Sequence, residues 1–310
     1  MTINNGEYFN INQISKKEFE NIFFDEHLPL LLNGLNMEMP AYRKWTFNFF
    51  KENMGHFLIP VGDDLKNPAA ISRKMSIRNY ITQLKEDKDC PYMVGWSYQR
   101  ECPTLDNDFT LPELHPDDFI HGLPRHLNYR RSWIFFGKES IESDLHIDSF
   151  AASAWIIMIH GQKTLRTFSP VHRHLVKMGT SLFDEENIRK IKNQGVEIIE
   201  FKLIPGTIMY LPGGWVHQIR NDNDTIMVTG AFTAKSHVFQ FYPSYQETIS
   251  KDINDSEEHY LSYIKNEFMN IEKLPKESIQ YIKEDILRTE RRIEIIQDKM
   301  KLYKSLLNKN

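Results

Sequence analysis

Residues 145–163 read LHIDSFAASAWIIMIHGQK, and residues 205–217 read PGTIMYLPGGWVH. Around these two stretches, from about residue 130 to 235, short apolar or alternating segments are separated by turns rich in Gly, Pro, Asn and Asp. Short strands at such spacing predict an antiparallel barrel or jelly roll rather than alternating β-α units. The expected strands are RSWIFFG (131–137), DLHIDSF (144–150), SAWIIMI (153–159), KTLRTFS (163–169), VEIIEFKL (196–203), GTIMYL (206–211) and TIMVTGAF (225–232). We therefore expect a mainly β core.

The first stretch contains two candidate metal ligands. In a strand, side chains alternate between faces, so His146 and Asp148 would share one face while Leu145 and Ile147 point to the other. His217 follows the PGGW turn, at the start of a strand expected on the facing side. Two imidazoles and one carboxylate on adjoining strands form the facial triad that leaves three positions open on iron(II). We therefore predict that His146, Asp148 and His217 bind a metal.

A lysine in the same region suggests a second binding group. Lys163 follows His160-Gly161-Gln162 and opens the segment KTLRTFS in an otherwise apolar region. It is either a surface lysine that keeps its ammonium in solvent or the point charge that binds the distal carboxylate of a dicarboxylic co-substrate. Its position relative to the HxD pattern favours the second interpretation. His172 and His174 form a minor rival metal site, but their loop context indicates a solvated surface.

The segments HIDSFAASAWIIMIHGQKTLRTFSP and PGTIMYLPGGWVHQIRNDNDTIMVTGAF together resemble the core of the JmjC (Jumonji C) oxygenases. They are most similar to the branch of protein hydroxylases and proposed arginine demethylases whose core reads HIDxxxxSAW followed by GxK. The resemblance covers about residues 128–235, with a looser likeness upstream. It implies a double-stranded β-helix (jelly roll, cupin-like) that uses Fe(II), 2-oxoglutarate and O2. The implied reaction hydroxylates a protein or peptide side chain and yields succinate and CO2.

The resemblance also assigns roles to individual residues. It implies that His146, Asp148 and His217 hold the iron, and that Lys163 binds the 2-oxoglutarate carboxylate. Three further cofactor-binding positions follow from it: Tyr92 as a tyrosine that helps to hold that carboxylate, Ser143 in place of a threonine three residues before the first ligand, and Thr229 as a threonine near the co-substrate. Each of the three also has an ordinary structural explanation: Tyr92 as an aromatic residue of the core, Ser143 as a hydroxyl in a turn, and Thr229 as a residue that favours strands.

The sequence departs from that branch at two positions. Ile156 and Ala231 stand where the relatives have asparagines near the co-substrate or the metal. Replacing amides by apolar groups removes hydrogen bonds around the site, which can weaken cofactor binding or change the positioning of oxygen. These departures leave the predicted metal ligands untouched.

We expect three parts along the chain. Residues 1–127 would form helices and strands that pack on the β core, with a helix capped by Ser15 and Glu18, a second helix at MSIRNYITQLKE, and a strand at Tyr92–Trp96. Residues 128–240 would form the core itself. Residues 241–310 would be helical, either lying on the core or forming a homodimer. A helix is expected to start near Pro275, and its apolar residues recur at steps of three and four, which gives a narrow apolar seam that favours the dimer. The seam residues are Ile279, Ile282, Ile286, Ile293, Ile296, Met300, Tyr303 and Leu307.

The composition restricts the class of protein. A formal charge of −4 over 310 residues gives no general attraction to nucleic acids, and the compact cluster Tyr129–Arg131 is read as a solvated strand end. The start of the chain has no basic stretch followed by an apolar run, and no segment approaches the roughly 20 apolar residues of a membrane helix. The two cysteines, Cys90 and Cys102, are too few for a disulfide framework. We therefore expect a cytoplasmic protein.

Three other functions are compatible with parts of this pattern. An oxygenase of the same fold that acts on a small molecule would have the same ligands. A non-catalytic cupin-like binding module would explain Ile156 and Ala231 as decay, but the intact ligands argue against it. A zinc hydrolase would also use two histidines and a carboxylate, but it would leave Lys163 without a role.

Overall fold

The computed structural model describes residues 4–6, 8–64, 70–86, 90–116, 132–148 and 152–232. The predicted C-terminal helices (241–310), with their dimer seam, and the cluster Tyr129–Arg131 lie outside these ranges. No helix within the described ranges is long and apolar enough to cross a membrane.

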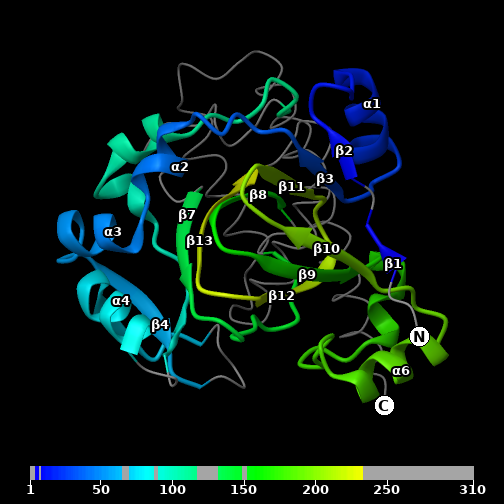
Figure 1. Cartoon of the computed structure of the whole chain (residues 1–310). Coiled ribbons are helices and arrows are strands. Elements are labelled where there is room, and N and C mark those ends of the chain that lie inside the picture. The colour runs from blue at the N-terminus through cyan, green and yellow to red at the C-terminus, as the bar shows by residue number, and fades with distance from the viewer. Residues whose placement is uncertain are drawn as a thin grey trace, which may run out of the picture.

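Two β-sheets form the core, and almost all neighbouring strands in them run antiparallel (Figure 1). The exceptions are the parallel pairs β2–β3 and β1–β10. The larger sheet has the order β2 (Tyr8–Asn10), β3 (Leu30–Asn33), β11 (Thr207–Leu211), β8 (Ser153–His160), β13 (Thr225–Phe232) and β7 (Ser132–Gly137). The smaller sheet has the order β1 (Asn4–Asn5), β10 (Ile199–Leu203), β9 (Lys163–Phe168) and β12 (Val216–Asn221). This arrangement confirms the predicted jelly-roll core.

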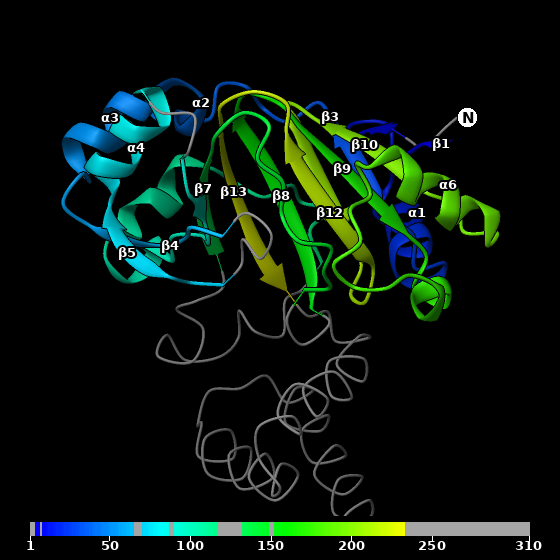
Figure 2. The ribbon, with the colours of Figure 1, turned by 90° about the horizontal axis from the view of Figure 1, so that it is seen from below.

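The remaining elements lie around the two sheets (Figure 2). A third sheet of order β5-β4-β6 and helices α2 to α4 lie beside β7, whereas α1 and α6 lie at the opposite side. Their bounds are α1 (Lys16–Glu20), the π-helical turn η1 (Asn21–Asp25), α2 (Pro40–Lys44), α3 (Phe47–Asn53), β4 (Leu58–Gly62), β5 (Arg73–Ser76), α4 (Ile77–Glu86), β6 (Tyr92–Met93), α6 (Glu185–Asn193) and the 3-10 turns η2 (Tyr98–Arg100), η3 (Pro103–Asp108) and η6 (Pro170–Leu175).

Buried side chains form three clusters, and the larger sheet separates two of them. Along β8, Ile156 and Met158 point between the sheets, whereas Trp155 and Ile157 pack against the N-terminal elements on the other face. Because both faces of β8 are covered, its sequence is a continuous apolar run instead of an alternating one. The third cluster lies under α6 and joins the segment between β9 and β10 to Leu145 and to Val216 of β12.

Local predictions in the N-terminal part are largely confirmed. Ser15 and Glu18 form the expected capping box at the start of α1, and α4 occupies the predicted helix at MSIRNYITQLKE. The strand expected over Tyr92–Trp96 is too long: β6 ends at Met93, and Trp96 forms only an isolated bridge. Gly95 causes this break, because its φ of +88° turns the chain out of the extended conformation.

Candidate metal centre

The ligand segment is not the regular strand that alternation predicted. Within the described residues 144–148, the only β pairing is an isolated bridge of His146 with His217. Between this bridge and the Glu142–Arg220 bridge, the ligand segment advances four residues while β12 advances three. This extra residue breaks the ladder as a bulge does. The prediction of a strand at 144–150 is therefore wrong for these residues, and His146 lies beside His217 rather than on a facing strand.

The three predicted ligands nevertheless converge. Asp148 Oδ1 lies 3.8 Å from His146 Nε2 and 3.9 Å from His217 Nε2, and one ligand atom from each residue lies within 4.8 Å of the others. Among the described residues, no other group of three or more metal-ligating side chains of this kind occurs. The His217 side chain is only 4% exposed, whereas His146 is 39% and Asp148 32% exposed. The cluster is therefore walled on the β12 side and reachable from solvent on the other.

Backbone carbonyls orient both imidazoles. His146 Nδ1 lies 2.8 Å from the carbonyl oxygen of Asp144, and His217 Nδ1 lies 3.1 Å from that of Trp215. A carbonyl oxygen only accepts, so each Nδ1 carries a proton, which leaves Nε2, on the side facing Asp148, as the ring nitrogen that can bind a metal. Burial, followed by the neighbouring His146, lowers the pKa of His217 to about 4, so His217 is neutral near pH 7. Two imidazoles and one carboxylate are a donor set that suits iron(II).

Lys163 faces the same space between the two sheets as His217, but it lies at the other end of the paired strands β9 and β12. In the register of β9 and β12, His217 opposes Thr167 and Lys163 opposes Asn221, so all four side chains share one face. Lys163 is 5% exposed, and no hydrogen bond or ion pair of its ammonium occurs among the described residues. Burial lowers its pKa to about 7. A buried cation without a counterion is costly, and a bound anion would compensate it.

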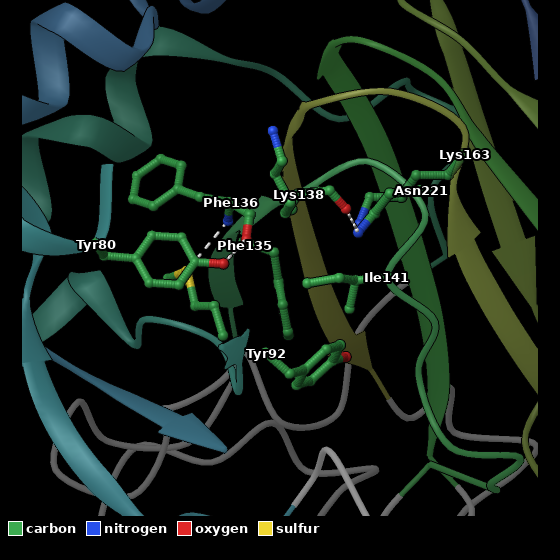
Figure 3. A pocket seen from close by; sticks show the side chains of 10 residues that line it. Tyr80, Tyr92, Phe135, Phe136, Lys138, Ile141, Lys163 and Asn221 are labelled. Carbon is green, nitrogen blue, oxygen red and sulfur yellow. Dashed lines mark hydrogen bonds between the residues drawn. The ribbon is translucent and has the colours of Figure 1, made fainter. Parts of the chain in front are cut away.

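Tyr92 and Lys163 line one small cavity at that end of the core (Figure 3). Burial raises the pKa of Tyr92, so its hydroxyl keeps its proton and remains a donor. Asn221 also lines this cavity, and the sequence prediction missed it. Its amide donates to the carbonyl of Lys138 at 2.9 Å. Counting in steps of two from His217 along β12 would have identified Asn221 as an interior residue.

The two hydroxyl residues taken from the resemblance bind the backbone. Ser143 Oγ accepts from the amide of Ile219 and donates to the carbonyl of Asp144, both at 3.0 Å. Thr229 Oγ1 donates to the carbonyl of Trp155 at 2.7 Å. In this arrangement both hydroxyls hold chain segments together at the edge of the interior.

The two departures from the related branch fall on β8 and β13. Ile156 is buried between the sheets and lies opposite Thr229 in the register, and Ala231 opposes Ala154. The wall next to Thr229 is therefore apolar where the resemblance predicts amides.

Comparison with known proteins identifies a matching family and several similar proteins. The cupin-like domain family matches residues 16–236. The chain is 25% identical over 299 residues to the lysine-specific demethylase JMJ21 of Arabidopsis thaliana, covering 84% of this chain and 31% of that protein. It is 24% identical over 251 residues to the bifunctional arginine demethylase and lysyl-hydroxylase psr-1 of Caenorhabditis elegans (75% and 62% covered). It is 25% identical over 253 residues to the 2-oxoglutarate and iron-dependent oxygenase JMJD4 of Mus musculus (70% and 58% covered). The chain thus spans less than two thirds of the length of each of these relatives.

Proposed function

The chain belongs to the cupin-like domain family, and from this membership we propose that it is an iron(II)- and 2-oxoglutarate-dependent oxygenase that hydroxylates a protein or peptide side chain. One observation carries the proposal. A cluster of two imidazoles and a carboxylate shares an interior with a buried lysine that lacks a counterion among the described residues. Relatives named as iron-dependent oxygenase and lysyl-hydroxylase support both the cofactors and the substrate class.

Each residue has a defined task in this proposal. Bound iron(II) would supply the activation of O2 that couples decarboxylation of 2-oxoglutarate to hydroxylation. His146, Asp148 and His217 would hold the ion from one side and leave its other positions free. Lys163 would bind the distal carboxylate of 2-oxoglutarate, and the Tyr92 hydroxyl would donate to the same group. The apolar core between the sheets would keep water away from the reacting atoms.

Ser143 and Thr229 have supporting tasks in the same proposal. Their hydroxyls would fix the chain beside the co-substrate through the backbone contacts described above. Two further proposals rest on the sequence alone: a cytoplasmic location, and a homodimer formed through residues 241–310. The division at residues 127 and 240 likewise remains a proposal.

Turnover in the absence of the natural substrate tests the reaction class. We expect the purified protein, given iron(II), ascorbate and 2-oxoglutarate, to release succinate slowly, and to release none when 2-oxoglutarate is omitted. Incubation with a cell extract should then add the mass of one oxygen atom to a protein or peptide, as detected by mass spectrometry. Oxygen incorporation into metabolites alone would instead identify a small-molecule oxygenase.

The pKa of Lys163 predicts how 2-oxoglutarate binding depends on pH. Below pH 7 the buried ammonium is already charged, whereas the free protein loses this proton as the pH rises through 7. Binding of the distal carboxylate restores the charge, so above pH 7 binding takes up a proton and the Kd rises by up to about tenfold per pH unit. Calorimetric titration with 2-oxoglutarate between pH 6.5 and 8.5, with manganese(II) replacing iron(II), measures this slope. Lys163→Met is the control and should show no comparable slope; equal slopes would contradict the assignment.

A further inference from the structure

The position of His146 depends on contacts outside regular secondary structure. Its segment is joined to β12 by the reciprocal backbone bonds of His146 with His217, at 2.8 and 3.0 Å, and by the amide of Ser143 bound to the carbonyl of Ile219. Between these contacts the ladder is interrupted by the extra residue. At this interruption β12 adds a side-chain contact to the ligand segment, from Gln218.

Gln218 follows His217 directly and points to the opposite face of the smaller sheet. It is 4% exposed, and its carboxamide joins three segments of the chain. Its Oε1 accepts from the amide of Leu182 at 2.6 Å. Its Nε2 donates to the carbonyl of Ser143 at 2.9 Å and to Glu142 Oε2 at 3.2 Å. Because Gln218 directly follows the buried ligand His217, its side chain ties the segment that carries His146 to β12 beside His217.

The segment between β9 and β10 supports the ligand segment from behind. Leu145, next to His146, is buried in the cluster formed by Leu182, Ile188 and Val216, and Ile147 packs against the same cluster. These are the two residues that alternate with the ligands His146 and Asp148. The side chains opposite the metal site are thus held by residues 169–198.

Arginines fasten this supporting segment to the sheet. Arg166 of β9 donates to the carbonyl of Leu182 at 2.8 Å. The Phe183 ring contacts the guanidinium groups of Arg166 and Arg220, which lie 4.6 and 4.5 Å from its centroid. The supporting segment is therefore attached to the sheet by Arg166, Arg220 and Gln218, and of these three only Gln218 also binds the backbone of the ligand segment, at the carbonyl of Ser143.

We propose that Gln218 is a positioning residue for the metal: its carboxamide sets where the His146–Asp148 segment stands relative to His217. The inference rests on the proposed metal site. This role requires an amide side chain, because the side chain must accept from the backbone N–H of Leu182 and donate to the carbonyl of Ser143 at the same time. A carboxylate does only the first, and a hydrocarbon does neither.

The competing explanation is that Gln218 only fastens residues 169–198 to the sheet, and two substitutions distinguish the explanations. Gln218→Leu removes every contact of the carboxamide. Gln218→Glu keeps the acceptor for Leu182 but removes the donor to Ser143 and places a carboxylate beside Glu142. If fastening were the whole role, the glutamate variant would restore it, whereas positioning of the ligand segment requires the donor.

The experiment is a titration of the metal-free full chain with cobalt(II), followed through its visible absorption, together with thermal melts of the metal-free proteins. We expect the Kd for cobalt(II) to increase by about 10-fold or more in both Gln218 variants, the size typical of groups that orient ligands, and the absorption of the bound ion to change. Gln162→Leu is the matched control. It loses a hydrogen bond from the same side-chain type to Asp222, away from the ligand segment, and should keep the parent Kd.

Two outcomes would overturn the proposal: parent-like cobalt affinity in Gln218→Glu, or the same loss of affinity in Gln162→Leu. If Gln218→Leu does not fold, the comparison of the glutamate variant with the parent decides the question. Failure of the proposed function has a different signature. The parent would then bind cobalt(II) and form no succinate with iron(II), and the Kd values would still decide the role of Gln218.

Discussion

His146→Ala is expected to remove high-affinity metal binding and to abolish succinate formation from 2-oxoglutarate. Three side chains form the proposed ligand set, and losing one should weaken metal affinity by more than the roughly 10- to 100-fold typical of groups that merely orient ligands. Because the His146 side chain is 39% exposed, the substitution leaves no buried cavity, and the free energy of unfolding should change by no more than about 1 kcal/mol. Metal content, succinate yield and a thermal melt on the same preparation measure the three effects.

A histidine outside the cluster provides the control for this substitution. His174 lies in the exposed turn η6 and belongs to no metal-ligating group among the described residues. His174→Ala should therefore keep both the metal and the activity. If His146→Ala bound iron(II) with the affinity of the parent protein, the assigned ligand set would be wrong.

Much of the β core follows from local patterns. Segments such as TIMYL and KTLRTF are short, apolar or alternating, and bounded by Gly, Pro and Asn turns, so strand positions were accessible from the sequence. The capping box of Ser15 and Glu18 was accessible for the same reason, since its two partners lie three residues apart. Tyr92–Trp96 shows the limit of this approach, because one glycine in a left-handed conformation ends the strand early.

The candidate site was only partly predictable. Alternation predicted that His146 and Asp148 share a face, and the PGGW turn predicted that His217 lies near them, yet the segment carrying His146 is not a regular strand. The three side chains converge all the same, because the reciprocal bonds between His146 and His217 preserve strand pairing at that one position. The extra residue in the ligand segment becomes visible only when its register against β12 is known.

Contacts between distant segments explain what the sequence did not predict. Gln218 binds residues 36 and 75 positions earlier in the chain, and no local pattern contains that information. The pairing of Lys163 with Asn221 likewise depends on the register of β9 with β12. The sequence left open whether Lys163 is buried or at the surface, and only the folded chain, in which Lys163 is 5% exposed, excludes a surface lysine.

Lys163→Met is expected to separate co-substrate binding from stability. Removing one partner of a buried charge pair typically costs 3–5 kcal/mol, so the apparent Kd for 2-oxoglutarate should increase by roughly 100-fold or more. Metal content should remain at the parent level, because Lys163 is not among the ligands. The folded protein without co-substrate should become more stable, since burial lowers the pKa of Lys163 to about 7 and folding therefore opposes its charge. We expect a gain of at least about 2 kcal/mol at pH 7, or roughly 4–8 °C in Tm.

The pH dependence of that stability gain makes the prediction specific. The unfolded chain keeps its lysine proton up to its ordinary pKa of about 10.4, whereas the folded protein loses it near pH 7. The cost of the buried ammonium is therefore complete below pH 7 and disappears as the pH rises from 7 toward 10.4. The difference in Tm between Lys163→Met and the parent should shrink over this interval.

Lys202→Met is a suitable control, because Lys202 lies on the same sheet and its side chain is 44% exposed and near Glu200. This substitution should neither raise the Tm nor change the Kd for 2-oxoglutarate. A stability gain at Lys163 without loss of 2-oxoglutarate affinity would show that the buried ammonium is not the group that binds the co-substrate.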